Sequence, residues 1–190
     1  QPICTTTVYS YIDKGIFLKV TNKDLPVKKN KKRKYNKVKK QKRVEAGESI
    51  ENRPEAINNR EEFGHWEMDC VVGRQYTRNV LLVLTERLTR YEIIMKMPNR
   101  KAATVVEYLD KLERKHGKHF RELFKSITVD NGSEFADFEG LEKSVYGGKR
   151  TTVYYCHPYT SCERGSNERI NRDIRRLFPK GTDFSKVMDK

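Results

Sequence analysis

Apolar runs separated by polar turns begin near residue 61 and predict a domain that mixes strands and helices. Short apolar or β-rich runs predict strands, and apolar residues repeated every three or four positions predict helices. Pro179 and Gly181 are expected to end the last helix. The expected strands are residues 65–72, 79–85, 91–97, 126–129 and 152–156, and the expected helices are residues 102–115, 134–145 and 166–178. This order predicts an α/β fold, a mixed sheet with helices on its faces.

The first residues form a separate pattern. Residues 5–17 carry apolar side chains at helical spacing, with Gly15 near the end, and predict one short amphipathic helix. A single helix of this size is too small to fold alone, so we expect it to be the last helix of a preceding domain. The chain begins with Gln1 and ends in a polar run, which is what a fragment of a longer protein would show.

Positive charge is concentrated between the helix and the mixed domain. The chain has 40 Lys and Arg against 26 Asp and Glu, a net charge of +14. From residue 23 to residue 43, twelve of 21 residues are basic and only Asp24 is acidic. Such a block repels itself and predicts an extended linker. We favour the interpretation that this block contacts DNA phosphates. The alternative is that it serves only as a solvated linker or a nuclear-type address. The cations expected to contact DNA are Lys28, Lys29, Lys31, Lys32, Arg33, Lys34, Lys37, Lys39, Lys40, Lys42 and Arg43.

Several classes of protein are excluded by composition. No apolar run approaches eighteen residues and none lies near the start, which excludes a membrane span and a signal peptide. The four Cys form no Cys-x-x-Cys pair and predict reduced thiols in a cytosol, with a zinc site the disfavoured alternative. The positive charge favours a polyanion as partner, nucleic acid before an anionic membrane surface.

Two aspartates are candidates for chemistry. Asp69 lies within the first predicted strand, where a carboxylate is costly to bury unless it is paired or binds a metal. Alternation along the strand places Asp69 on the face of Glu67 and Val71. Asp130 follows the strand 126–129, at the end where ligands bind in α/β sheets. A simple Asp-Asn-Gly turn is the alternative for this second aspartate.

A third acidic segment follows the last predicted strand. Residues 157–169 pass through a Pro-Tyr turn and enter a helix with a carboxylate in its first turn. Such a carboxylate is often only a partner of the helix dipole. If it converges with the two aspartates, the cluster would suit two hard divalent cations. A metal pair about 4 Å apart stabilises the attacking and leaving oxygens in phosphoryl transfer.

Three blocks of the sequence resemble the DDE transposases of the insertion sequence thirty family. They are Gly-His-Trp-Glu-Met-Asp within residues 64–73, Thr-Val-Asp-Asn-Gly-Ser-Glu-Phe in 128–135, and Tyr-Tyr-Cys-His-Pro-Tyr through Glu-Arg-Gly-Ser-Asn-Glu to Phe-Pro-Lys-Gly-Thr-Asp, from residue 154 onward. The blocks come in the family's order. The third block also resembles retroviral integrases.

The resemblance implies an RNase H-like catalytic core with a two-metal site for Mg²⁺ or Mn²⁺ on Asp69, Asp130 and Glu168. It implies cleavage of transposon ends and their transfer to target DNA, in a homo-oligomer, without a membrane or a small-molecule substrate. It also implies a bacterial cytoplasmic protein associated with the nucleoid. The expected domains are residues 1–20, the end of a helical DNA-binding domain; residues 21–60, the basic linker; and residues 61–190, the C-terminally truncated core.

The identity of the catalytic glutamate is a choice between two residues. Glu163 and Glu168 follow Asp130 with 32 and 37 residues between, and this spacing slightly favours Glu163. Helical phase favours Glu168, because a stripe that would pack on the sheet consists of Ile170, Ile174 and Leu177. Arg172 and Arg175 lie four and seven residues after Glu168, on its face, and are expected to contact DNA phosphate. The resemblance also places the ligand at Glu168.

Four further polar residues are expected beside the ligands or against the substrate, and they are His65, Asn131, His157 and Asn167. For the two histidines, packing is an equal alternative. Two other functions stay open at this point: a non-catalytic DNA-binding remnant of a transposase, and an RNase H-like nuclease.

Overall fold

In a computed structural model of the chain, the described residues fall into two compact units. The structure describes residues 3–25, 47–157 and 165–187, and for residues 165–168 it describes the backbone alone. The first unit contains helix α1 (Thr5–Asp13). This helix ends before the predicted Phe17, because Gly15 adopts a positive φ of 68° that interrupts helical geometry.

The second unit is built on one mixed sheet with the strand order β1-β6-β5-β2-β3-β4. Strands β2, β3 and β4 are antiparallel neighbours, while β5 and β6 run parallel to β2. Their bounds lie within one or two residues of the predicted ones: β2 (His65–Val72), β3 (Val80–Glu86), β4 (Glu92–Met97), β5 (Ser126–Val129) and β6 (Thr152–Tyr155). This arrangement confirms the predicted fold class, an RNase H-like mixed sheet with helices on its faces.

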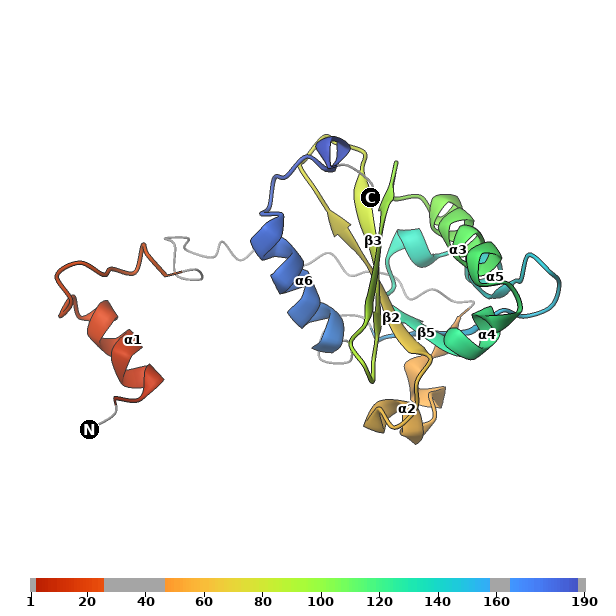
Figure 1. Cartoon of the computed structure of the whole chain (residues 1–190), viewed down its shortest axis with the longest axis horizontal. Coiled ribbons are helices and arrows are strands. Elements are labelled where there is room, and N and C mark those ends of the chain that lie inside the picture. Colours follow the sequence, from red (N-terminus) through yellow and green to blue (C-terminus); the bar gives the residue numbers. More distant parts are fainter. Residues whose placement is uncertain (1–2, 26–46, 158–164, 188–190) are drawn as a thin grey trace. The chain divides into compact units, whose positions relative to one another are not determined.

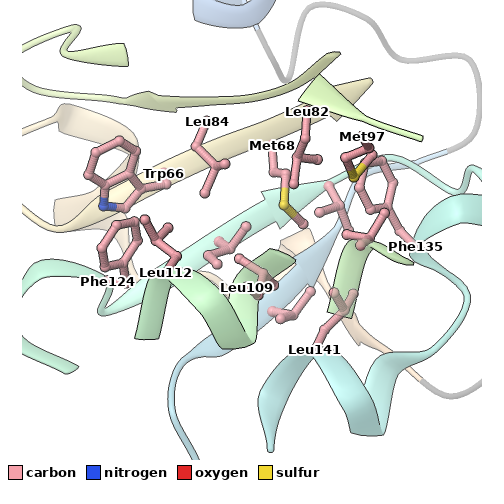
Figure 2. Close-up of a cluster of buried hydrophobic side chains, with 14 of the residues drawn as sticks. Trp66, Met68, Leu82, Leu84, Met97, Leu109, Leu112, Phe124, Phe135 and Leu141 are labelled. Atoms are coloured by element: carbon pink, nitrogen blue, oxygen red, sulfur yellow. The ribbon is translucent and has the colours of Figure 1, made fainter. Parts of the chain in front are cut away.

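Helices cover both faces of the sheet (Figure 1). Helices α3 (Ala102–His116), α4 (Phe120–Leu123) and α5 (Phe138–Glu142) lie on one face, and α6 (Gly165–Leu177) lies on the other. The alternation predicted for β2 separates two cores: Met68 belongs to the cluster on the α3 face, and Val71 packs with Ile170 of α6. Figure 2 shows the larger cluster, in which Leu109 and Leu112 of α3 lie against sheet residues. No helix among the described residues is long and apolar enough to cross a bilayer.

The helix predicted over residues 134–145 is divided in two. A 3₁₀ turn, η3 (Ser133–Phe135), precedes α5 (Phe138–Glu142). Asp137 restarts the helix as its N-cap, since its carboxylate accepts a hydrogen bond from the backbone N–H of Gly140. After α5 the chain turns back and pairs Lys143 with Lys149 in an isolated bridge. The apolar periodicity of this segment therefore predicted a longer helix than the caps allow.

The core unit starts earlier in the chain than the predicted residue 61. Residues assigned to the linker form β1 (Glu48–Ser49), the turn η1 (Ile50–Asn52) and helix α2 (Glu55–Asn59). Strand β1 adds a parallel edge to β6, and Ile50 and Ile57 are buried. A strand of two residues leaves no periodic pattern in a sequence, so β1 was not among the predicted strands.

Candidate active site

Asp69 and Asp130 come from the two parallel strands at the centre of the sheet. Strand β2 pairs with β5 in a register that joins His65 to Ser126 and Glu67 to Thr128. Continuing this register by two residues places Asp130 beside Asp69. Two aspartates that are 61 residues apart in the sequence are thus brought together by strand pairing.

The carboxylate of Asp69 is oriented by two donors. Its Oδ1 accepts a hydrogen bond from the backbone N–H of Cys70 at 2.8 Å. Its Oδ2 accepts one from the side-chain amide of Asn171 at 2.6 Å. Asn171 lies on α6 between the buried residues Ile170 and Ile174. Asn171 was not among the residues predicted for the site, although its place next to the apolar stripe of the helix was a signal in the sequence.

The loop after β5 is tied to the neighbouring strand. Asp130 Oδ1 accepts a hydrogen bond from the backbone N–H of Gly132 at 2.9 Å. The buried side chain of Asn131 donates to the carbonyl of Cys156 at 2.6 Å, just beyond β6. These two contacts fix the Asp-Asn-Gly segment at the end of β5, where the strand register places Asp130 beside Asp69.

Several charges act on the thiol of Cys70, which is half buried next to Asp69. Burial is the largest cause that raises the pKa of Cys70, and nearby charges shift it further. In order of effect, these charges belong to Glu134, Asp69, the opposing cation Arg100, and Asp130. The charges of three carboxylates and one guanidinium therefore act at this position. Neither Glu134 nor Arg100 was among the residues predicted for the site.

The two histidines beside the motifs make identifiable contacts. His65 is buried at the start of β2, where Nδ1 lies 2.8 Å from Ser126 Oγ and Nε2 lies 3.2 Å from Glu62. His157 Nε2 lies 2.9 Å from a carboxylate oxygen of Glu51. For His65 these contacts favour the packing alternative. A substrate contact stays a prediction for both.

Helix α6 carries the remaining predicted site residues. The backbone of Glu168 lies in its first turn, but the side chains of Glu168 and Asn167 lie outside the described residues, as does all of Glu163. Arg172 is exposed. Arg175 donates from Nη2 to the carbonyl of Val72 at 2.6 Å, and burial lowers its pKa.

The apolar stripe of α6 is partly different from the prediction. Ile170 and Ile174 are buried, but Leu177 is 78% exposed. The helix ends at Leu177, and Phe178 packs in its place against Phe184, with ring centroids 5.9 Å apart. Because the helix ends there, the chain turns so that Phe178, eight residues after Ile170, meets the core instead of Leu177, seven residues after it.

The donor set can be compared with the chemistry of the expected cations. Asp69 and Asp130 offer carboxylate oxygens, which Mg²⁺ and Mn²⁺ prefer, and burial disfavours the thiolate form of Cys70 that zinc would need. Within the described part of the chain, no group of three or more His, Cys, Asp or Glu is placed to hold a metal. The third expected ligand, Glu168, has no described side chain. The two aspartates supply oxygen donors of the kind that a hard divalent cation binds.

The cationic tract from Lys28 to Arg43, expected to contact DNA, lies outside the described residues.

Comparison with known proteins gives the family context. Residues 59–161 match the integrase core domain family. The chain is 38% identical over 184 residues to the probable transposase for insertion-like sequence element IS1161 of Streptococcus salivarius, covering 96% of this chain and 49% of that protein. It is 36% identical over 141 residues to the transposase for insertion sequence element IS4351 of Bacteroides fragilis, covering 74% of this chain and 40% of that protein.

A further relative is the transposase InsI for insertion sequence element IS30C of Escherichia coli, 37% identical over 137 residues, covering 72% of this chain and 33% of that protein. The chain thus spans half or less of the length of these relatives. Among solved structures, the catalytic core domain of BIV integrase overlaps 60% of this chain and 68% of its own, at 20% identity and a TM-score of 0.45. The simian T-cell lymphotropic virus intasome overlaps 60% of this chain and 38% of its own, at 18% identity and a TM-score of 0.48.

Proposed function

Because this chain belongs to the integrase core domain family, we propose that it is the catalytic part of an insertion-sequence transposase of the DDE type, related to the insertion sequence thirty family. Its reaction is the cleavage of DNA at transposon ends and the joining of those ends to a target. The main support is the parallel register of β2 and β5, which sets Asp69 beside Asp130 at the centre of the sheet.

In this proposal Asp69, Asp130 and Glu168 hold Mg²⁺ or Mn²⁺. The bound cations supply charge stabilisation for the in-line displacement at phosphorus. The protein's own contribution is positioning: Asn171 and the Cys70 amide orient Asp69, and the Gly132 amide orients Asp130. No side chain of the chain forms a covalent bond to DNA.

The partners follow from the same proposal. Arg172, exposed on α6, contacts DNA phosphate, and the cations of the linker add affinity that is independent of sequence. Residues 1–20 end a helical DNA-binding domain, and the active form is a homo-oligomer that holds two transposon ends. The protein acts in the bacterial cytoplasm, where the chromosome lies.

A nicking assay tests the proposal. The chain is incubated with supercoiled plasmid and Mn²⁺, and conversion to the open circular form is followed on a gel. The unmodified chain nicks the plasmid, whereas Asp69→Asn and Asp130→Asn abolish nicking and leave DNA affinity close to the original value. The control is Glu139→Gln, an exposed carboxylate on α5, which nicks normally.

Two results would reject the proposal. Nicking by Asp69→Asn or Asp130→Asn at a rate comparable to the unmodified chain would remove the catalytic assignment. DNA binding by the unmodified chain without any nicking would favour the non-catalytic, DNA-binding alternative.

A further inference from the structure

Glu134 is a buried carboxylate that the proposed reaction does not use. It lies in the turn η3, four residues after Asp130, and is 2% exposed. A buried carboxylate is costly unless a cation and hydrogen bonds compensate its charge. Its position close to the proposed metal ligands makes the identity of its partner important.

The partner is Arg100, which lies just before α3 and binds Glu134 with both sides of its fork. Arg100 Nε donates to Oε1 at 2.8 Å, and Nη2 donates to Oε2 at 2.7 Å. The side chain of Arg100 is 45% exposed, so the pair reaches from the solvent to the interior. The hydrogen bond to Glu134 is the main cause that raises the pKa of Arg100. Both oxygens of Glu134 are thus occupied by one guanidinium.

Glu134 and Asp130 flank the same glycine. A Cβ atom on Gly132 would lie 2.5 Å from Glu134 Oε2 and 2.8 Å from Asp130 Oδ1. Gly132 has an ordinary φ of −65°, so the space that it leaves, rather than its backbone freedom, is what the site requires. The two carboxylates are therefore neighbours, and both face the space that Gly132 leaves open.

We propose that Arg100 is a positioning residue that withholds Glu134 from the metal site of Asp69 and Asp130. The inference rests on the proposed function, since it presupposes that those aspartates hold the cation. A carboxylate held by two parallel N–H donors has its favourable lone pairs directed at the guanidinium. Without Arg100, Glu134 would be an uncompensated buried anion beside Asp130, and joining the divalent cation would relieve it.

Removing Arg100 should change the metal affinity in the opposite direction to simple structural damage. Loss of Arg100 should tighten metal binding by more than roughly fivefold. One extra negative charge that stays several ångströms from a divalent cation accounts for roughly fivefold at water-like screening, and a carboxylate that joins the cation's ligands adds to this. A residue that only supported the fold would, on removal, loosen the site and weaken metal binding.

Isothermal titration calorimetry with Mn²⁺ on the 190-residue chain provides the test. Arg100→Met keeps the length of the side chain, removes the charge and should bind Mn²⁺ more tightly by more than the roughly fivefold that the charge change alone would give. The double variant Arg100→Met/Glu134→Gln restores the net charge and leaves no unpaired carboxylate. Its affinity should return to within about twofold of the unmodified chain. Arg100→Lys retains the cation and serves as the matched control, with affinity close to the original value.

The outcomes separate this inference from the proposed function. If the unmodified chain binds Mn²⁺ and Arg100→Met gains roughly fivefold in affinity or less, the withholding role of Arg100 is overturned while the metal site stands. If Arg100→Met does not fold, the double variant decides: a loss of affinity greater than roughly fivefold would mean that Glu134 is itself a ligand. If neither the unmodified chain nor Arg100→Met binds Mn²⁺, the proposed metal site fails, and this inference fails with it.

Discussion

Asp69 depends on a residue that is far away in the sequence. Asn171 donates to its Oδ2 across a separation of 102 residues, and the amide of Cys70 donates to its Oδ1. The amide of Asn171 orients the carboxylate without itself bringing a positive charge to it, whereas a lysine or arginine donor would bring one. This difference suits a carboxylate that must keep its attraction for a cation.

The choice between the two candidate glutamates gives a prediction at the scale of single residues. Glu168 lies in the first turn of α6, the helix that delivers Asn171 to Asp69, whereas Glu163 precedes that helix in the sequence. Glu168→Gln is therefore expected to stop Mn²⁺-dependent nicking by removing a ligand oxygen's charge. Glu163→Gln, the matched control, is expected to nick at the original rate. Gel analysis of plasmid nicking measures both, and the reverse pattern would assign the role to Glu163.

At the scale of elements, α6 is the part on which the site depends most. It carries Glu168, Asn171 and Arg175, and it packs on β2 and β3 through Ile170 and Ile174. The hydrogen bond to Asp69 can form only while this packing holds the helix on the sheet. The apolar stripe and the polar site residues of α6 therefore act together.

Two substitutions on α6 test this packing. Ile174 is 5% exposed, so Ile174→Ala removes buried methyl groups and leaves a cavity, which should cost about 3 kcal/mol in the free energy of unfolding. Leu177 is 78% exposed, so Leu177→Ala should change that free energy by less than about 0.5 kcal/mol. Urea unfolding of both variants measures the difference. Equal losses would show that Leu177 is buried, as its helical spacing predicted.

At the scale of the whole molecule, the net charge of +14 is spread unevenly between the parts of the chain. Twelve of the cations lie in residues 23–43, between α1 and the core. Tethered cations of this kind raise the local affinity for DNA without reading its sequence. The proposed domains are residues 1–20, 21–60 and 61–190, and the structure adds β1 and α2, within residues 48–59, to the unit that contains the sheet.

Salt dependence tests the role of this tract. If about six of its cations contact phosphates, the slope of log K against log salt should be roughly −5, as measured by fluorescence anisotropy on a DNA duplex. Replacing the twelve cations with Gln keeps the length of the tract and should flatten the slope markedly. A tract that is only a spacer would leave the slope unchanged in this variant.

Local patterns were sufficient to predict most of the sheet. The apolar runs located β2 to β6 to within one or two residues, and alternation along β2 separated the face of Met68 from that of Val71. The two aspartates were recognised because a carboxylate in or after an apolar strand is unusual. These features are encoded within a few neighbouring residues, so the sequence by itself determined them.

The remaining features required the tertiary structure. Strand β1 exists because β6 offers it an edge, and the end of α6 decides that Phe178, not Leu177, meets the core. The pairs Asn171–Asp69 and Arg100–Glu134 join residues 102 and 34 positions apart. No local periodicity encodes such contacts, because they depend on which helices and loops the folded sheet brings together.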